Sequence, residues 1–245
     1  MRRMLVTAVF VLLVSFSLSY AGQPTAYVDN DAGTAPLPPY SGPKARIAVA
    51  DFDVKAAQAT FQIGSGLREM LVTALVNSKR FSVVERQALA AVMQEQELSS
   101  SGAAQGKGAG GPQRGKIKTA DLIISAAVTE FEPEASGGRA GIGGGGFTGS
   151  GILGGILGAS FNKSHMALDI RIIDASTSEV LAATRVQGEA SDVGGGLMTG
   201  FFGSWALGGG LSMYSNTPME KAIRVCIIEA VRYIAQEIPP TFYKY

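Results

Sequence analysis

Few residues of this 245-residue chain have the type and spacing that catalysis requires. Asp51 and Asp53 lie on one face of an expected strand, where two carboxylates could work as an acid–base pair. No second acid–base or metal-ligating cluster accompanies them, so we favour their interpretation as a strand end that opens into solvent. His165, the only histidine, has no partner at catalytic or metal-ligand spacing. We therefore expect a protein that is not an enzyme, with no catalytic residue, no cofactor and no metal.

Two further sequence features could indicate a binding or redox site, but the other residues that such a site requires are missing. Gly64 and Gly66 flank Ser65 after an expected strand, as in a phosphate-binding loop, but neither a third glycine nor a Gly-Lys-Ser/Thr sequence follows. Cys226 is the only cysteine, so no disulfide forms within the chain, and its place on the apolar side of an expected helix predicts a buried, inert thiol. The formal net charge of +1 lacks the basic excess of nucleic-acid binders, so we expect no nucleic-acid partner.

The amino-terminal residues predict export across the inner membrane. Residues 1–21 combine a basic start, an apolar core and a small-x-small cleavage site, which together are typical of a cleaved signal peptide. A retained anchor helix is the alternative. No cysteine lies at the cleavage site, so we expect no lipid attachment there. Residues 22–43 contain five prolines and predict an extended strap rather than packed structure.

Residues 44–245 predict one domain, and a hydrophobic fraction of 46% is enough for an apolar core. Strands are expected at 46–54, 81–85, 120–131, 164–174 and 179–189, and helices at 65–78, 86–98 and 219–237. Leu89, Val92 and Met93 form the expected apolar side of the second helix, and residues 99–115 have the composition of a loop. This order of elements predicts an α/β (α+β) fold, with a mixed sheet covered by helices.

Two glycine-rich inserts, 137–161 and 192–213, interrupt this domain. Each is long enough for a hairpin of two membrane-crossing strands of roughly 9–11 residues. The second insert alternates large apolar with small or polar residues, whereas residues 151–159 of the first also fit a helix with a row of small residues. Mobile glycine-rich loops are the alternative. The candidate membrane-facing residues are Phe147, Phe161, Leu197, Phe201, Trp205, Leu207 and Leu211.

A membrane role for the inserts would require several copies of the chain. Two hairpins supply four strands, too few to close a barrel, and an open sheet edge is not stable in lipid. If the inserts span a membrane, a homo-oligomer must therefore close the barrel.

Four segments, in order and at compatible spacing, resemble a known family. They are residues 70–89 (MLVTALVNSKRFSVVERQAL), 119–132 (TADLIISAAVTEFE), 167–184 (ALDIRIIDASTSEVLAAT) and 215–234 (SNTPMEKAIRVCIIEAVRYI). On these segments the chain resembles the curli production assembly/transport (CsgG) family of outer-membrane secretion channels.

The resemblance implies a periplasmic domain that forms a homo-oligomeric ring, with two hairpins per subunit in one outer-membrane barrel. Unfolded polypeptides of an extracellular fibre would leave through it, and periplasmic accessory proteins are further candidate partners. In the family, a loop after the first strand lines a constriction with aromatic and amide side chains. Residues 55–62 match this loop, so Gln58, Phe61 and Gln62 are the candidate constriction residues. The alternative for Phe61 is packing under the following helix.

Three features differ from typical family members: the missing lipidation cysteine, a shorter constriction segment and more glycine in the hairpins. They motivate an alternative function, a soluble periplasmic binding or scaffold protein without a pore. Of these two functions, we expect the export channel: a non-enzymatic channel subunit in the outer membrane that faces the periplasm.

Overall fold

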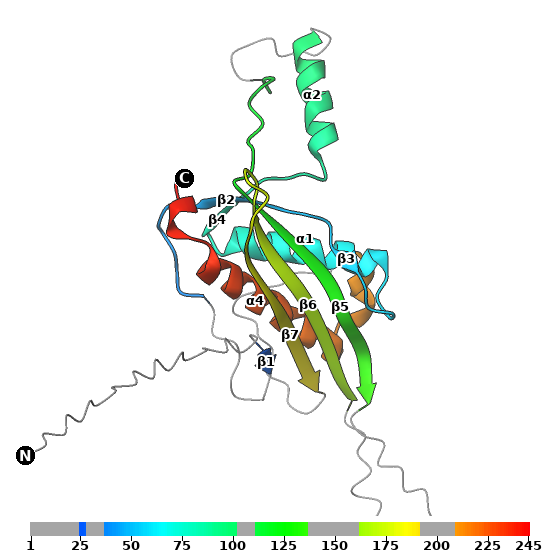
Figure 1. Ribbon diagram of the computed structural model, residues 1–245. Coiled ribbons are helices and arrows are strands. Elements are labelled where there is room, and N and C mark those ends of the chain that lie inside the picture. The colour runs from blue at the N-terminus through cyan, green and yellow to red at the C-terminus, as the bar shows by residue number, and fades with distance from the viewer. Residues whose placement is uncertain (1–24, 28–36, 102–110, 137–161, 192–208) are drawn as a thin grey trace, which may run out of the picture.

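The computed structural model describes residues 25–27, 37–101, 111–136, 162–191 and 209–245. They build a seven-stranded mixed sheet in the order β1-β7-β6-β5-β2-β4, with β3 paired to β5 (Figure 1). The strands are β1 (Thr25–Tyr27), β2 (Ala45–Val49), β3 (Asp53–Val54), β4 (Phe81–Val83), β5 (Leu122–Ser136), β6 (Asn162–Asp174) and β7 (Val180–Ser191). The helices are α1 (Phe61–Asn77), α2 (Leu89–Ser101) and α4 (Pro218–Glu237), with short 3-10 helices η1 (Gly209–Tyr214) and η2 (Pro240–Phe242). The predicted mixed α+β fold is confirmed.

The sheet combines two kinds of pairing. Strands β5, β6 and β7 form an antiparallel meander, whereas β2 runs parallel to both β4 and β5, and β1 runs parallel to β7. The strand expected at 46–54 is divided into β2 and β3. Ala50 N–H still donates to Ile124 O of β5 (2.8 Å), but Asp51 and Phe52 leave the ladder, and the Phe52 side chain turns into the core at 5% exposure.

Helices α1 and α4 cover one face of the sheet and leave the other face open (Figure 1). Strand β6 shows why: Met166, Leu168, Ile170 and Ile172 alternate along the strand and are fully buried beneath the helices. Helix α4 supplies the opposing apolar surface, and Thr217 caps its start by accepting a hydrogen bond from Glu220 N–H (3.4 Å). The open face carries polar side chains, as is common for antiparallel sheets.

A glycine in β7 allows α4 to approach the sheet closely. A Cβ atom at Gly188 would lie 2.1 Å from the Ala222 carbonyl oxygen and 3.1 Å from Cys226 Cβ. Both distances are shorter than ordinary van der Waals contact. Any larger residue at this position would therefore push helix and strand apart.

The expected apolar side of the second helix does not face the core. Val92 and Met93 of α2 are 43% and 56% exposed, and Gln96 is the only buried residue of this helix. Figure 1 shows the reason: α2 stands away from the sheet instead of lying over it. Helix α2 also extends to Ser101, three residues beyond the expected end. The rest of the expected loop falls partly on residues 102–110, outside the described residues.

The end of the second insert is not part of a hairpin. Residues 209–213 belong to η1, and Leu211 is fully buried in the core, so its predicted membrane-facing role is wrong. The physical reason is that η1 packs on α1, where Gly210 lets the helix come close to Gln62. The other hairpin candidates, Phe147, Phe161, Leu197, Phe201, Trp205 and Leu207, lie outside the described residues, as do the expected signal peptide and most of the strap.

Candidate functional site

The segment expected at the constriction lies between β3 and α1 and is held by backbone hydrogen bonds. The N–H groups of Lys55 and Ala56 both donate to the Val128 carbonyl of β5 (2.9 and 3.0 Å). Ala59 N–H donates to Ala56 O (3.1 Å) and closes a turn. The segment is thus fixed to the sheet at its start and to α1 at its end.

Helix α1 begins earlier than expected. Thr60, rather than Ser65, caps the helix, and its Oγ1 accepts a hydrogen bond from Ile63 N–H (3.4 Å). Gly64 therefore lies inside the helix, where a Cβ atom would come 2.7 Å from Val54 Cγ2. This glycine serves helix packing instead of a loop, so Phe61 and Gln62 occupy the first helical turn.

The three constriction candidates point into solvent from this one segment. Gln58, Phe61 and Gln62 are all exposed, and Phe61 is 74% exposed, a high value for an aromatic side chain. Phe61 thus does not pack under the helix, which excludes the alternative drawn from the sequence. An exposed aromatic ring beside two amides can line a passage only when copies of the chain come together, and that constriction stays a prediction.

Both inserts leave the sheet at the same end. Ser136, the last residue of β5, pairs with Asn162, the first residue of β6, so 137–161 begins and ends at one point of the ladder. Lys163 of β6 pairs with Ser191, the last residue of β7, where the second insert begins. Three adjacent strand ends therefore carry the inserts.

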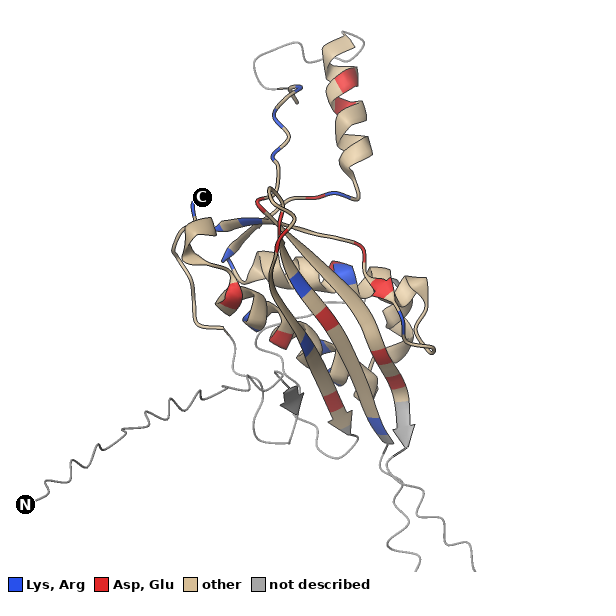
Figure 2. Ribbon diagram, viewed as in Figure 1, with Lys and Arg blue, Asp and Glu red and all other residues tan. Residues whose placement is uncertain are grey.

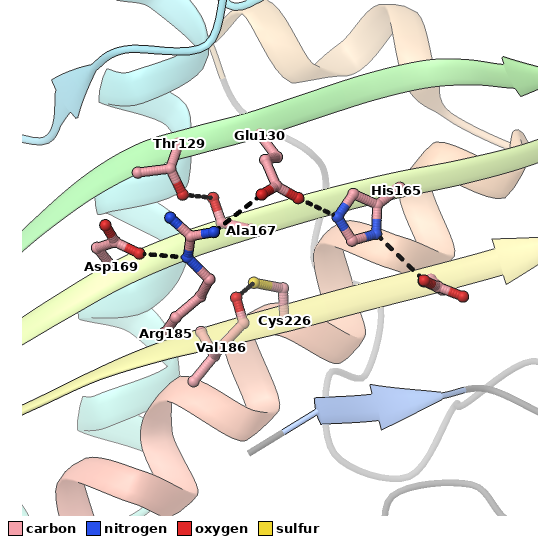
Figure 3. Close-up of polar contacts among 9 residues, drawn as sticks. Thr129, Glu130, His165, Ala167, Asp169, Arg185, Val186 and Cys226 are labelled. Carbon is pink, nitrogen blue, oxygen red and sulfur yellow. Dashed lines mark hydrogen bonds and ion pairs between the residues drawn. The ribbon is translucent and has the colours of Figure 1, made fainter. Parts of the chain in front are cut away.

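Near this end, the open face of the sheet carries a cluster of charged side chains, here called the outer-face cluster (Figure 3). Arg185 of β7 donates to Asp169 Oδ1 (2.8 Å) and to Glu130 Oε1 (2.9 Å). His165 Nε2 lies 2.5 Å from Glu130 Oε2, and its Nδ1 lies 3.5 Å from Glu189 Oε1. The cluster comprises Glu130, His165, Asp169, Arg185 and Glu189 and connects β5, β6 and β7.

A β-bulge places Glu130 in this cluster. The ladder pairs Val128 with Leu168 and then Glu130 with Ala167, so Thr129 is an extra residue in β5. Strict alternation would turn Glu130 toward the helices, but the bulge turns it to the open face and sends Phe131 into the core. The sequence interpretation missed His165's partners because nothing in the local pattern marks the bulge or the neighbouring strand.

The outer-face cluster is an ion-pair network. The hydrogen bond and charge of Asp169, together with the charge of Glu130, raise the pKa of the Arg185 guanidinium above its usual value. Two carboxylates that share one guanidinium would repel each other without it. Arg185 therefore holds three strands together at the end that carries the inserts.

Replacing Arg185 with glutamine should lower stability by about 1 kcal/mol, because Glu130 and Asp169 lose their shared cation in a partly exposed network. Thermal unfolding at low and high salt measures this. Arg171→Gln is the matched control, since this exposed side chain makes no ion pair within the described ranges. An equal loss in both variants would contradict a specific role for Arg185.

The carboxylate pair and the cysteine considered from the sequence come together in no second site within the described residues. Asp51 contacts Arg68 (3.7 Å) and Gln87, whereas Asp53 faces the open side of the sheet near Asp169, so the two carboxylates are exposed and have different neighbours. Cys226 is fully buried, and burial raises the pKa of its thiol, as expected for an inert cysteine. Across the described ranges, no group of three or more His, Cys, Asp and Glu side chains could hold a metal ion.

Comparison with known proteins decides the family. A family model described as curli production assembly/transport component CsgG matches residues 31–240. The chain belongs to the CsgG family. The resemblance noted in the sequence is thereby confirmed, and the matched range includes residues 55–62, the outer-face cluster and both inserts.

This CsgG-family chain is similar to one named protein and to several solved structures. A Neisseria meningitidis serogroup B protein, named as a lipoprotein, is 28% identical over 207 residues, which cover 81% of this chain and 78% of the relative. The solved structure of hypothetical protein CT253 from Chlamydia trachomatis has a TM-score of 0.43 and 14% identity, over 79% of this chain and 97% of that one. The PelC dodecamer from Paraburkholderia phytofirmans has a TM-score of 0.35 and 13% identity, over 82% and 96%.

No helix in the described part of this CsgG-family chain has both the length and the apolar composition needed to cross a bilayer.

Proposed function

We propose that this chain is a non-enzymatic subunit of a ring-forming outer-membrane channel that exports unfolded polypeptides of an extracellular fibre. The observation that carries the proposal is that the two inserts leave the sheet at the same end. They start from adjacent strand ends, at Ser136, Asn162 and Ser191, so two hairpins of one subunit would enter a membrane side by side. Hairpins of neighbouring copies could then pair and close a barrel without a free edge.

The exposed constriction segment supports the same function. In a ring, one Phe61 from each copy would form an apolar collar, and Gln58 and Gln62 would offer hydrogen bonds to a passing backbone. A ring of single aromatic side chains narrows a pore yet binds each segment of an unfolded chain weakly. No nucleotide-binding motif accompanies the segment, so transport would be diffusive or driven by partner proteins.

The name of the Neisseria relative supports a location in the cell envelope. We propose the outer membrane, with the described domain facing the periplasm. The predicted signal peptide would export the chain, and because Cys226 is its only cysteine, lipid attachment at the predicted cleavage site is not expected.

Single-channel conductance in planar bilayers tests the proposed function. The purified full chain should form discrete channels, and Phe61→Ala should increase the unitary conductance by roughly twofold or more, because it removes the collar. Val76→Ala, which shortens a 45% exposed side chain at the other end of α1, should leave the conductance unchanged. Absence of channels, or equal effects of both variants, would contradict the proposal.

A second candidate function, an envelope scaffold or binding protein without a pore, is favoured by the missing lipidation cysteine and the high glycine content of the two inserts. Protease treatment of outer-membrane fractions separates the two functions. Membrane-inserted hairpins should protect 137–161 and 192–208 from cleavage, whereas a scaffold should be cut in both inserts.

A further inference from the structure

Lysine and arginine positions gather at the corner of the domain near the C-terminus (Figure 2). Aromatic rings lie among these cations, and we call the region the basic-aromatic corner. It lies where β2, the turn before β4 and residues 243–245 come together. Tyr243 contacts Phe81 and Tyr40 through their rings at 6.3 and 6.2 Å, and it bridges to Ala45. The cationic residues of the corner are Lys44, Arg46, Lys79, Arg80 and Lys244.

Tyrosine rings hold the two arginines in place. The Arg46 guanidinium lies 3.6 Å from the centroid of the Tyr245 ring, and the Arg80 guanidinium lies 4.6 Å from that of Tyr40. Tyr40 Oη in turn donates to Pro43 O (2.6 Å), and Tyr245 Oη donates to Asp121 Oδ2 (3.0 Å). A stacked guanidinium keeps N–H groups that can donate to an incoming carboxylate, and it loses little side-chain entropy on binding.

These cations lack acidic partners of their own. Within the described ranges, none of the five forms an ion pair with Asp or Glu, whereas Arg185, Arg224 and Arg232 elsewhere each do. Nε of Arg46 and Nε of Arg80 are buried and have no hydrogen-bond partner in the described part of the chain. Asp121 is also at this corner, where it accepts from Tyr245 Oη, so five cations and one carboxylate leave a local charge of about +4. In a chain whose formal net charge is only +1, this is a marked local asymmetry.

We propose that the basic-aromatic corner binds an acidic segment of another polypeptide. Charge complementarity identifies the partner as anionic, and the position of the corner argues against a membrane surface. Asp121 N–H donates to Arg46 O (3.0 Å) just before β5 starts, and the 15 residues of β5 then run to the inserts. At about 3.3 Å per residue, the corner lies about 45 Å from the strand ends that carry the inserts.

That orientation, with the corner facing the periplasm, rests on the proposed function, and so does the preference for a polypeptide over a membrane surface, whereas binding of an anionic partner does not. An acidic polypeptide would bind the corner at the end of the domain that lies farthest from the membrane. The acidic side chains would pair with the arginines and lysines, and the exposed rim of the tyrosines would contact apolar parts of the same segment.

Binding of fluorescently labelled poly-L-glutamate to the full chain in detergent tests the proposal. Fluorescence anisotropy at low salt should show binding that weakens as salt increases. Lys44→Gln/Lys244→Gln and Arg46→Gln/Arg80→Gln should each weaken it by roughly tenfold. Lys163→Gln/Arg171→Gln is the matched control, because it removes the same charge from exposed positions of β6, and it should change affinity by less than about twofold.

Equal weakening by all three double variants would overturn the proposal, since it would show attraction by overall charge alone. The proposal would also be overturned if dextran sulfate or phosphatidylglycerol vesicles bound as tightly as poly-L-glutamate and were weakened by the same corner variants. The partner would then be a glycan or a membrane. Thermal unfolding identifies any loss caused by misfolding. The two lysine side chains are exposed, and Lys244 Nζ makes only a distant contact with the Phe242 ring (5.6 Å), so this double variant should fold and keep the proposal testable. A chain that forms no channels but binds poly-L-glutamate through the corner would refute the channel and keep this proposal.

Discussion

Gly188→Ala should lower the free energy of unfolding by about 3 kcal/mol, although it adds a single methyl group. The new Cβ would lie 2.1 Å from the carbonyl oxygen of Ala222. That oxygen belongs to the α4 backbone and cannot rotate away, so the helix must move off β7. Movement of α4 also opens the packing around Cys226, which is fully buried. Urea denaturation, followed by circular dichroism, measures the loss.

Ala183→Ser is the control for this change. Ala183 lies on the same strand but is exposed on the open face, so one additional heavy atom there meets solvent. Its effect should stay within about 0.5 kcal/mol. If Gly188→Ala is tolerated as well as Ala183→Ser, α4 does not pack against β7 as closely as the structure describes.

Phe131→Ala should cost about 3–5 kcal/mol, because it leaves a cavity in the core. Phe131 is 2% exposed, and its ring meets the Tyr214 ring edge-on at a centroid distance of 5.4 Å. This contact links β5 to η1, at the described end of the second insert. The variant should therefore unfold at a lower denaturant concentration and free η1 from the core, which hydrogen exchange at η1 would detect.

Phe61→Ala supplies a chemically identical control for Phe131→Ala. Phe61 is 74% exposed, so its truncation should change stability by less than about 0.5 kcal/mol. The two variants thus separate folding from the proposed collar. Phe131→Ala should lower stability, whereas Phe61→Ala should change only the conductance. Similar losses of stability in both would show that Phe61 packs against the domain.

Elements with a regular period were predictable from the sequence. Along β6, buried Leu168, Ile170 and Ile172 alternate with polar residues, and α4 repeats apolar residues at helical spacing. Where packing overrides the local pattern, the sequence was insufficient. Gly64 suggests a loop but lies in α1, because Thr60 rather than Ser65 caps the helix and Gly64 packs against Val54. Leu211 suggests a lipid contact but reaches the core, because η1 packs on α1, which is distant in the sequence.

The candidate site was predictable only in part. Gln58, Phe61 and Gln62 were located through family resemblance, and the structure adds that all three are exposed. The outer-face cluster was not predictable, because its members come from three strands and depend on the bulge at Thr129. His165 and Glu130 are 35 positions apart, and no periodicity in either strand indicates that they meet.

Assembly in the membrane is the central claim, and single-particle imaging of the full chain, extracted from outer membranes in mild detergent, tests it most directly. We predict closed rings with a detergent-covered barrel at the end that carries the inserts, and with the Phe61 side chains around the central passage. Small particles that leave the membrane without detergent and show neither ring nor barrel would contradict the channel.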